Sequence, residues 1–215
     1  MTFVVVLFGW IFSVCLHEFA HALVAYWGGD TAVKDKGYLS LNPIKYADPI
    51  YSFALPVLFL VAGGIGLPGG AVYVDCNRLR SRAWQSAMSL AGPAANALLA
   101  VMIGLLLQYT DLGDGAWGPA LSFLGLLQVS SVILNLLPVP MLDGFRAIEP
   151  WLPHDIRESA YRLGPNGVFF VMLALWYVRP LNAALWGAAY AAAFAIGIPL
   201  DQAFDGFGQF RFWKI

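Results

Sequence analysis

A His-Glu-Phe-Ala-His segment at residues 17–21 has the residue types and the spacing needed for metal chemistry. Residues four apart lie on one face of an α-helix, so the imidazoles of His17 and His21 can reach the same metal ion. Glu18 lies about 100° around the helix from His17, on the same flank. This is the HExxH arrangement, in which two histidines bind zinc and the glutamate is the general base for a zinc-bound water. The alternative is a chance match, with the polar side chains satisfied by neighbouring helices.

The helix that must carry these residues is apolar along its length. Residues 3–27 form a run long enough to cross a bilayer. At a rise of about 1.5 Å per residue, His17 lies roughly 20 Å from the start of this run and roughly 15 Å from its end. An ionisable residue at that depth is energetically costly and therefore indicates a functional site. We expect the metal to lie inside the bilayer rather than at its surface.

A third ligand is predicted near the end of a later apolar run, where residues 135–144 read Asn-Leu-Leu-Pro-Val-Pro-Met-Leu-Asp-Gly. Pro138 and Pro140 break the helix there and free backbone groups. Asp143 is the only acid of this stretch, and its carboxylate would complete a three-ligand zinc site with a water in the fourth position. Taken alone, the stretch is more typical of a turn at a membrane surface. Its combination with an HExxH pattern inside the membrane favours the ligand.

The composition is that of an integral membrane protein. Hydrophobic residues make up 60% of the 215 residues and charged residues 12%, about half the usual share for a soluble domain. The mean hydropathy is +0.69. The net charge of −1 and the absence of a basic cluster argue against a nucleic-acid partner. The two cysteines, Cys15 and Cys76, do not make a disulfide framework. The first run has no cleavage site for a signal peptidase, so we expect a retained membrane helix.

The chain has three clear membrane-spanning runs, at 3–27, 83–109 and 117–137, and a weaker pair at 167–178 and 181–200. Between the first two runs, an apolar stretch at 49–67 is interrupted by proline and glycine and is followed by strand-like residues. Irregular backbone of this kind is tolerated in a membrane only inside protein or beside a wet cavity. The sequence therefore predicts an all-α polytopic membrane protein with about five or six membrane segments and a re-entrant or β-strand insertion after the first helix.

The strand-like residues are Ala71, Val72, Tyr73 and Val74. The peptide bonds of a helical substrate are shielded, so a membrane helix must be unwound locally before it is cleaved. An extended edge beside the metal can receive such a segment by strand addition. These four residues are our candidates for that edge, although a simple connecting strand would look the same.

With these motifs in place, the chain resembles the site-2 protease family of intramembrane zinc metalloproteases. The resemblance rests on HEFAH at 17–21, NLLPVPMLDG at 135–144 and a GPxxN-type stretch at 92–96, and extends to Asn-Pro at 42–43 and Asp-Pro at 48–49. It is closest to the compact bacterial subgroup that lacks PDZ or CBS domains. We expect a single membrane metalloprotease domain over 1–215, with the core motifs in 1–165 and apolar C-terminal segments in 166–200.

The resemblance implies an endopeptidase that hydrolyses peptide bonds in or near transmembrane segments of other membrane proteins. It makes His17, His21 and Asp143 the ligands of one Zn²⁺ per chain and Glu18 the catalytic acid and base. Two asparagines, Asn96 and Asn135, would hold the substrate backbone or polarise its carbonyl. Buried asparagines also serve as polar contacts between membrane helices, which is the alternative for both.

Two other classes of function remain open at this point. A zinc-binding scaffold without activity would be expected to lack the general base, and Glu18 is present. A metal transporter would be expected to show repeated halves, and no repeat is visible. The partners expected are a membrane-protein substrate with a transmembrane segment and the lipid bilayer; a regulatory partner is not indicated by any residue. Lysine and arginine follow the C-terminal end of the HExxH helix and recur in the later loops expected on the same side. By the positive-inside rule we expect the active site to lie towards the cytoplasm, in a prokaryotic plasma membrane.

Overall fold

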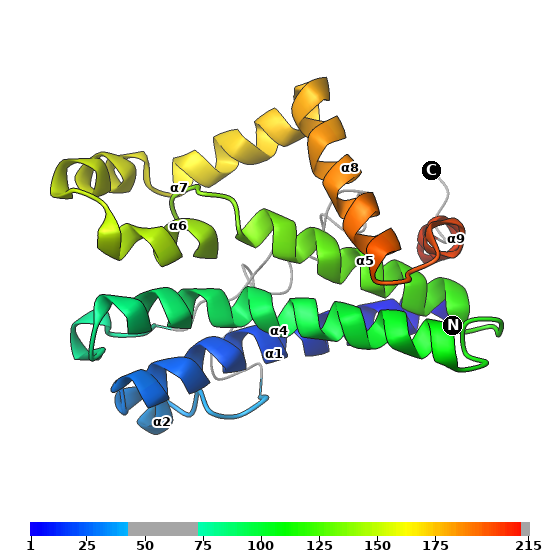
Figure 1. Ribbon diagram of the computed structural model, residues 1–215, viewed down its shortest axis with the longest axis horizontal. Helices are drawn as coiled ribbons and strands as arrows, with labels where there is room; N and C mark the ends of the chain where they lie inside the picture. Colours follow the sequence, from blue (N-terminus) through cyan, green and yellow to red (C-terminus); the bar gives the residue numbers. More distant parts are fainter. Residues whose placement is uncertain (43–72, 212–215) are drawn as a thin grey trace.

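The computed structural model describes residues 1–42 and 73–211, with the backbone alone at 163–166, 168, 169 and 172. Every regular element of these residues is helical, and no strand occurs among them, which confirms the predicted all-α class (Figure 1). The elements in chain order are α1 (Thr2–Gly28), α2 (Ala32–Asp35), η3 (Cys76–Arg78), α4 (Arg82–Tyr109), α5 (Gly118–Asn135), α6 (Asp143–Ile148), η4 (Glu149–Trp151), α7 (His154–Tyr177), α8 (Arg179–Ala195) and α9 (Leu200–Phe210).

Three helices of the described residues are long and apolar enough to cross a membrane: α1, α4 and α5. They coincide with the three clear runs of the sequence. A fourth crossing is obtained if α8 and α9, which meet at 118°, count as one broken span. The chain is therefore a membrane protein with three or four such spans in its described part. A total of five or six, and a re-entrant insertion, stay predictions, because the stretch at 49–67 lies outside the described residues.

Local sequence explains where these helices begin and end. Ser81 caps α4 by accepting a hydrogen bond from the backbone N–H of Trp84 at 3.4 Å. Helix α1 ends at Gly28, and the following Gly29 has a φ of 121°, which a residue with a side chain rarely adopts. Helix α5 ends at Asn135, shortly before Pro138, which cannot continue it.

The C-terminal third differs from the predicted runs. Helix α7 begins at His154, well before the apolar run that starts at residue 167. The charged segment that precedes this run belongs to the same helix. Helix α8 starts directly after α7, with Pro180 in its first turn, where a missing N–H costs nothing. The chain then turns at Gly197, with a φ of 80°, into α9, a helix that the hydropathy pattern did not predict.

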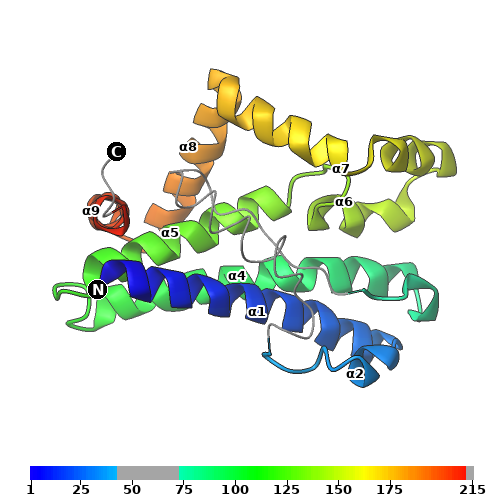
Figure 2. The same cartoon turned by 180° about the vertical axis from the view of Figure 1, so that it is seen from behind.

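Helix α5 is the centre of the bundle. It packs against α1, α4, α8 and α9, and 78% of its most apolar window is buried, against 33% for α1 and 39% for α4. Figures 1 and 2 show α1, α4 and α5 side by side. The outer faces of α1 and α4 expose large apolar side chains to the surroundings, as expected for helices in contact with lipid. Among these side chains are Val4, Phe8, Phe12, Leu98, Met102 and Leu105.

The C-terminal end of α1, the N-terminal end of α4 and the C-terminal end of α5 lie at the same end of the bundle (Figure 1). Asp30, which is fully buried, holds this arrangement: its carboxylate accepts hydrogen bonds from the backbone N–H of Asp75 at 2.9 Å and of Ala32 at 3.2 Å. The backbone N–H of Arg80 also donates to the Gly28 carbonyl at 2.9 Å. The chain therefore enters α4 from the side on which it left α1.

This arrangement predicts which loops share a side of the membrane. Single cysteines at Lys34 and Asn77, both exposed, should react with an impermeant maleimide from one side, and a cysteine at Asp114, exposed in the α4–α5 turn, from the other. The measurement is labelling of intact and of inverted vesicles in a Cys15→Ala, Cys76→Ala background. Labelling of Lys34→Cys and Asn77→Cys from opposite sides would contradict this arrangement.

Candidate metal centre

The structure brings both histidines of the HExxH segment together with Asp143. The two Nε2 atoms of His17 and His21 lie 3.0 Å apart, and Oδ2 of Asp143 lies 3.1 Å from the first and 3.5 Å from the second. All three side chains are buried. Within the described residues, they form the one group of three or more His, Cys, Asp or Glu side chains whose ligand atoms lie close enough to share a metal ion.

The spacing of these atoms matches what zinc requires. Zn–N and Zn–O bonds of about 2.0–2.1 Å in a tetrahedron put two ligand atoms about 3.3–3.4 Å apart. The three separations observed here, 3.0, 3.1 and 3.5 Å, lie around that value. Two imidazoles and one carboxylate also make a ligand set typical of catalytic zinc, with one position left for water or substrate. The residues present therefore fit a zinc ion.

A contact to α4 fixes the orientation of one imidazole. Nδ1 of His21 lies 2.7 Å from the backbone carbonyl of Met88. A carbonyl can only accept, so Nδ1 carries the hydrogen and Nε2 of the neutral ring keeps its lone pair for the metal. Nδ1 of His17 is buried and has no hydrogen-bond partner within the described residues.

A small cavity lies against the catalytic side of α1. Its volume is about 10 Å³, close to the space that one water molecule needs. It is bordered by His17 and Glu18 from α1, by Asn96 from α4 and by Ser131 from α5. Glu18 is buried there, so the predicted general base sits beside a ligand and out of bulk water.

Helix α4 approaches the imidazoles at a glycine. A Cβ atom added to Gly92 would lie 2.3 Å from Nε2 of His21 and 2.5 Å from Nε2 of His17, closer than any real contact. Sequence reasoning used Gly92 only as a part of the family motif and missed this role. The available signal was a glycine followed by Pro93 inside an apolar helix, a costly pair that needs a packing reason.

The turn between α5 and α6 positions the aspartate. Pro138 and Pro140 follow the end of α5, Met141 has a positive φ of 80°, and α6 begins at Asp143 itself. A Cβ at Gly144 would lie 2.2 Å from the Leu136 carbonyl oxygen, so the first turn of α6 rests directly on the end of α5. The prolines thus end the helix as predicted, and the fold brings the aspartate back over the histidines.

The amide groups of Asn96 and Asn135 both contact the hydroxyl of Ser131, a residue that was not predicted from the sequence. Nδ2 of Asn96 donates to Oγ of Ser131 at 3.0 Å, and Nδ2 of Asn135 lies 3.4 Å from the same oxygen. The first bond joins α4 to α5, and the second lies within α5. Oδ1 of Asn96 is buried without a partner among the described residues. Of the predicted substrate strand, Ala71 and Val72 lie outside the described residues. Tyr73 and Val74 belong to no regular element, and the Tyr73 carbonyl accepts a hydrogen bond from Nζ of Lys36 at 2.9 Å.

A bundle of apolar helices that encloses two histidines and an aspartate defines a membrane metalloprotein. The chain is 41% identical over 213 residues to "Putative zinc metalloprotease Rip2" of Mycolicibacterium smegmatis, covering 99% of this chain and 82% of that protein. It is 39% identical over 217 residues to the Mycobacterium tuberculosis H37Rv protein of the same name, with the same coverage. "Putative zinc metalloprotease YwhC" of Bacillus subtilis is 36% identical over 189 residues, 82% of this chain and 81% of that protein.

These relatives show the family. The chain belongs to the site-2 protease family of zinc metalloproteases, as the motifs indicated. No model of a known protein family matches the chain, and no solved structure matches it.

Substituting Gly92 by alanine tests the close approach of α4. The added methyl group must push the imidazoles of His17 and His21 out of place, so we expect the affinity for zinc to fall by about 10–100-fold or more. Competition with a chelator and metal analysis of the purified protein measure this. Gly187→Ala is the matched control, because a Cβ there meets nothing within 4 Å. Equal zinc affinity in the two variants would show that Gly92 does not support the ligands.

Proposed function

We propose that this protein is an intramembrane zinc endopeptidase that hydrolyses peptide bonds in or near transmembrane segments of membrane proteins. The observation that carries the proposal is the buried group of His17, His21 and Asp143 with Glu18 beside it, inside a bundle of apolar helices. The names of the relatives, which are those of zinc metalloproteases, support the same reaction class.

In this proposal, His17, His21 and Asp143 hold one zinc ion per chain. Zinc, when bound, supplies a Lewis acid that lowers the pKa of a water molecule to near neutrality and polarises a carbonyl group. Glu18 accepts the proton of the attacking water and delivers it to the leaving amine. The burial of Glu18 excludes bulk water from this exchange and strengthens every electrostatic contact around it.

The substrate is a membrane protein whose transmembrane helix is opened locally near the metal. Asn96 and Asn135 donate hydrogen bonds to its backbone or to the developing oxyanion. In the structure, their amide groups meet at Ser131, and Asn96 borders the cavity that Glu18 also borders. The candidate strand of Ala71, Val72, Tyr73 and Val74 receives the unwound segment by strand addition.

Loop charge supports an active site that faces the cytoplasm of a prokaryotic cell. The metal-bearing end of the bundle carries a concentration of lysine and arginine, whereas the turn at 110–117 has neither. Short loops rich in these residues remain on the cytoplasmic side. The basic residues of the metal-bearing end are Lys34, Lys36, Arg78, Arg80, Arg82, Arg146, Arg157 and Arg162.

Separate substitutions distinguish the ligands from the base. His17→Ala or Asp143→Ala should abolish zinc binding and cleavage together, because a three-ligand site is not maintained by two ligands. Glu18→Gln should keep zinc and slow cleavage by about 10²–10⁴-fold, because it removes the proton acceptor and no ligand. The measurements are metal analysis and cleavage of a membrane-embedded reporter substrate.

Matched controls come from the exposed pair at the start of α7. His154 and Asp155 are 79% and 100% exposed, so His154→Ala and Asp155→Ala should leave both zinc and activity unchanged. Full zinc occupancy in Asp143→Ala would refute its assignment as the third ligand. Undiminished cleavage by Glu18→Gln would refute the assignment of the base.

The Asn135→Ala variant tests whether Asn135 contacts the substrate or only joins helices. If Asn135 contacts substrate, the variant should keep its zinc and its unfolding midpoint while cleavage slows by about 10²–10³-fold. If it only joins helices, the free energy of unfolding should fall by about 0.6–2 kcal/mol and activity should fall with it. A thermal melt, metal analysis and a cleavage assay on one preparation decide between the two. A midpoint that drops in step with activity refutes the substrate role.

A further inference from the structure

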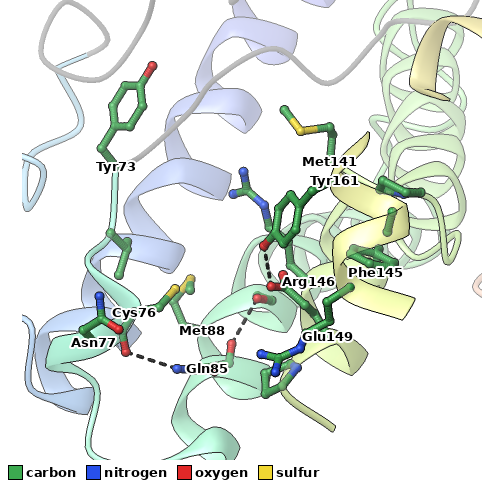
Figure 3. Close-up of a pocket in the computed structure, with 16 residues that line it drawn as sticks. Tyr73, Cys76, Asn77, Gln85, Met88, Met141, Phe145, Arg146, Glu149 and Tyr161 are labelled. Carbon is green, nitrogen blue, oxygen red and sulfur yellow. Dashed lines mark hydrogen bonds between the residues drawn. The ribbon is translucent and has the colours of Figure 1, made fainter. Parts of the chain in front are cut away.

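A second, larger cavity of about 400 Å³ is lined by residues that neighbour the metal ligands (Figure 3). Met141 and Phe145, which flank the ligand Asp143 in sequence, form one wall. Met88, whose carbonyl holds the His21 imidazole, forms another. Tyr73 and Val74, the last two residues of the predicted substrate strand, also line the cavity. A peptide that leaves the metal in an extended conformation therefore has a cavity directly beside its path.

The ionisable side chains of this cavity carry an excess of positive charge. Arg146 and Arg157 contribute two positive charges, and Glu149 contributes one negative charge. Glu149 already accepts a hydrogen bond from the Tyr161 hydroxyl. Burial, together with this bond to Glu149, raises the pKa of Tyr161 to about 12, so Tyr161 remains a neutral donor. The Cys76 thiol, another titratable group of the lining, has its pKa raised chiefly by burial and is also neutral.

One of the two arginines has a shielded N–H without an acceptor within the described residues. This N–H is at Nε of Arg157, whose side chain is half-buried, whereas Arg146 is exposed. Arg162, on the same helix as Arg157 but outside the cavity, donates to Glu158 at 2.7 Å. A shielded guanidinium N–H without an acceptor is costly. The partner that a guanidinium group prefers is a carboxylate, which it binds through two parallel hydrogen bonds.

We propose that this cavity is a subsite for an acidic side chain of the substrate. An aspartate or glutamate a few residues from the scissile bond enters between α4 and the start of α7 and pairs with Arg157 and Arg146. Arg146 follows the ligand Asp143 by three residues, which is about 5 Å along α6. An extended substrate covers that distance in about two residues. This inference rests on the proposed function and adds a substrate preference to it.

A lipid phosphate is the other anion available at a membrane surface. The peptide carboxylate is favoured because the cavity walls are the residues around the metal ligands and the end of the predicted substrate strand.

Cys76 offers a direct readout, because its thiol lines the cavity (Figure 3). The experiment measures the rate of maleimide alkylation of Cys76 in the full chain with Cys15→Ala, in neutral detergent. The probes are two soluble peptides of equal length, one with a single aspartate between apolar residues and one with asparagine in its place. We expect the aspartate peptide to slow alkylation at least about fivefold more than the asparagine peptide at the same concentration, a difference typical of one charge-assisted hydrogen bond.

We expect the stronger protection by the aspartate peptide to depend on the two cavity arginines. Arg157→Gln and Arg146→Gln should abolish the difference between the peptides, and Arg162→Gln, the matched control, should retain it. Rates with and without peptide are compared within each variant, because the loss of Arg146 itself changes the pKa of the Cys76 thiol. An unchanged unfolding midpoint excludes a general loss of structure.

Several outcomes would overturn the inference. These are equal protection by both peptides, protection by neither, or a preference that survives both arginine substitutions. Protection by nanodiscs of anionic lipid, without any preference between the peptides, would assign the cavity to a headgroup instead. The assay needs neither zinc nor cleavage, so its failure is separate from a failure of the proposed function, which the zinc and cleavage measurements on Glu18→Gln and Asp143→Ala detect.

Discussion

The burial of three ionisable side chains among apolar helices is the constraint on which the rest of this structure depends. Charged or hydrogen-bonding groups at membrane depth are stable only with partners in place. Here the imidazole of His21 is held by the Met88 carbonyl, and Asp143 lies against both imidazoles. These contacts come from α1, α4 and the α5–α6 connection, so they fix the relative register of three segments that generic apolar packing would leave free to slide.

The close approach of the helix backbones makes these contacts possible. Small residues let membrane helices approach each other in the absence of a hydrophobic driving force between them. Gly92 places the backbone of α4 directly against the ligand nitrogens, and Gly144 lets α6 rest on the end of α5. At the end of the bundle, the buried carboxylate of Asp30 ties residue Asp75 to the end of α1 and so fixes where α4 begins.

A polar layer within the bundle continues from the metal centre along α5. Nε2 of Gln128 donates to Oγ of Ser13 on α1, and Nδ2 of Asn96 on α4 donates to Oγ of Ser131. Each bond joins α5 to a different neighbour, and bonds of this kind stabilise membrane helix pairs by about 0.6 kcal/mol on average. The layer makes α5 the element that holds α1 and α4 at a fixed distance around the site.

The sequence by itself determined the helices and the chemistry of the centre. A spacing of four on a helix puts His17 and His21 on one face whatever surrounds them, and hydropathy alone gave α1, α4 and α5 nearly to the residue. The proline pair predicted that the chain would turn before Asp143, because proline cannot continue a helix. The predicted strand at 71–74 and the number of membrane segments stay predictions.

Tertiary structure alone decided which distant residues support those ligands. Nothing local in the sequence pairs the Met88 carbonyl with His21, places Gly92 against two imidazoles or joins Asn96 to Ser131, because these contacts depend on how α4 crosses α1 and α5. The same holds for the cavity that gathers Arg146, Arg157 and Cys76 from separate segments. A hydropathy pattern records which face of a helix is apolar. It does not record which neighbouring helix that face contacts, and the site is formed by those contacts.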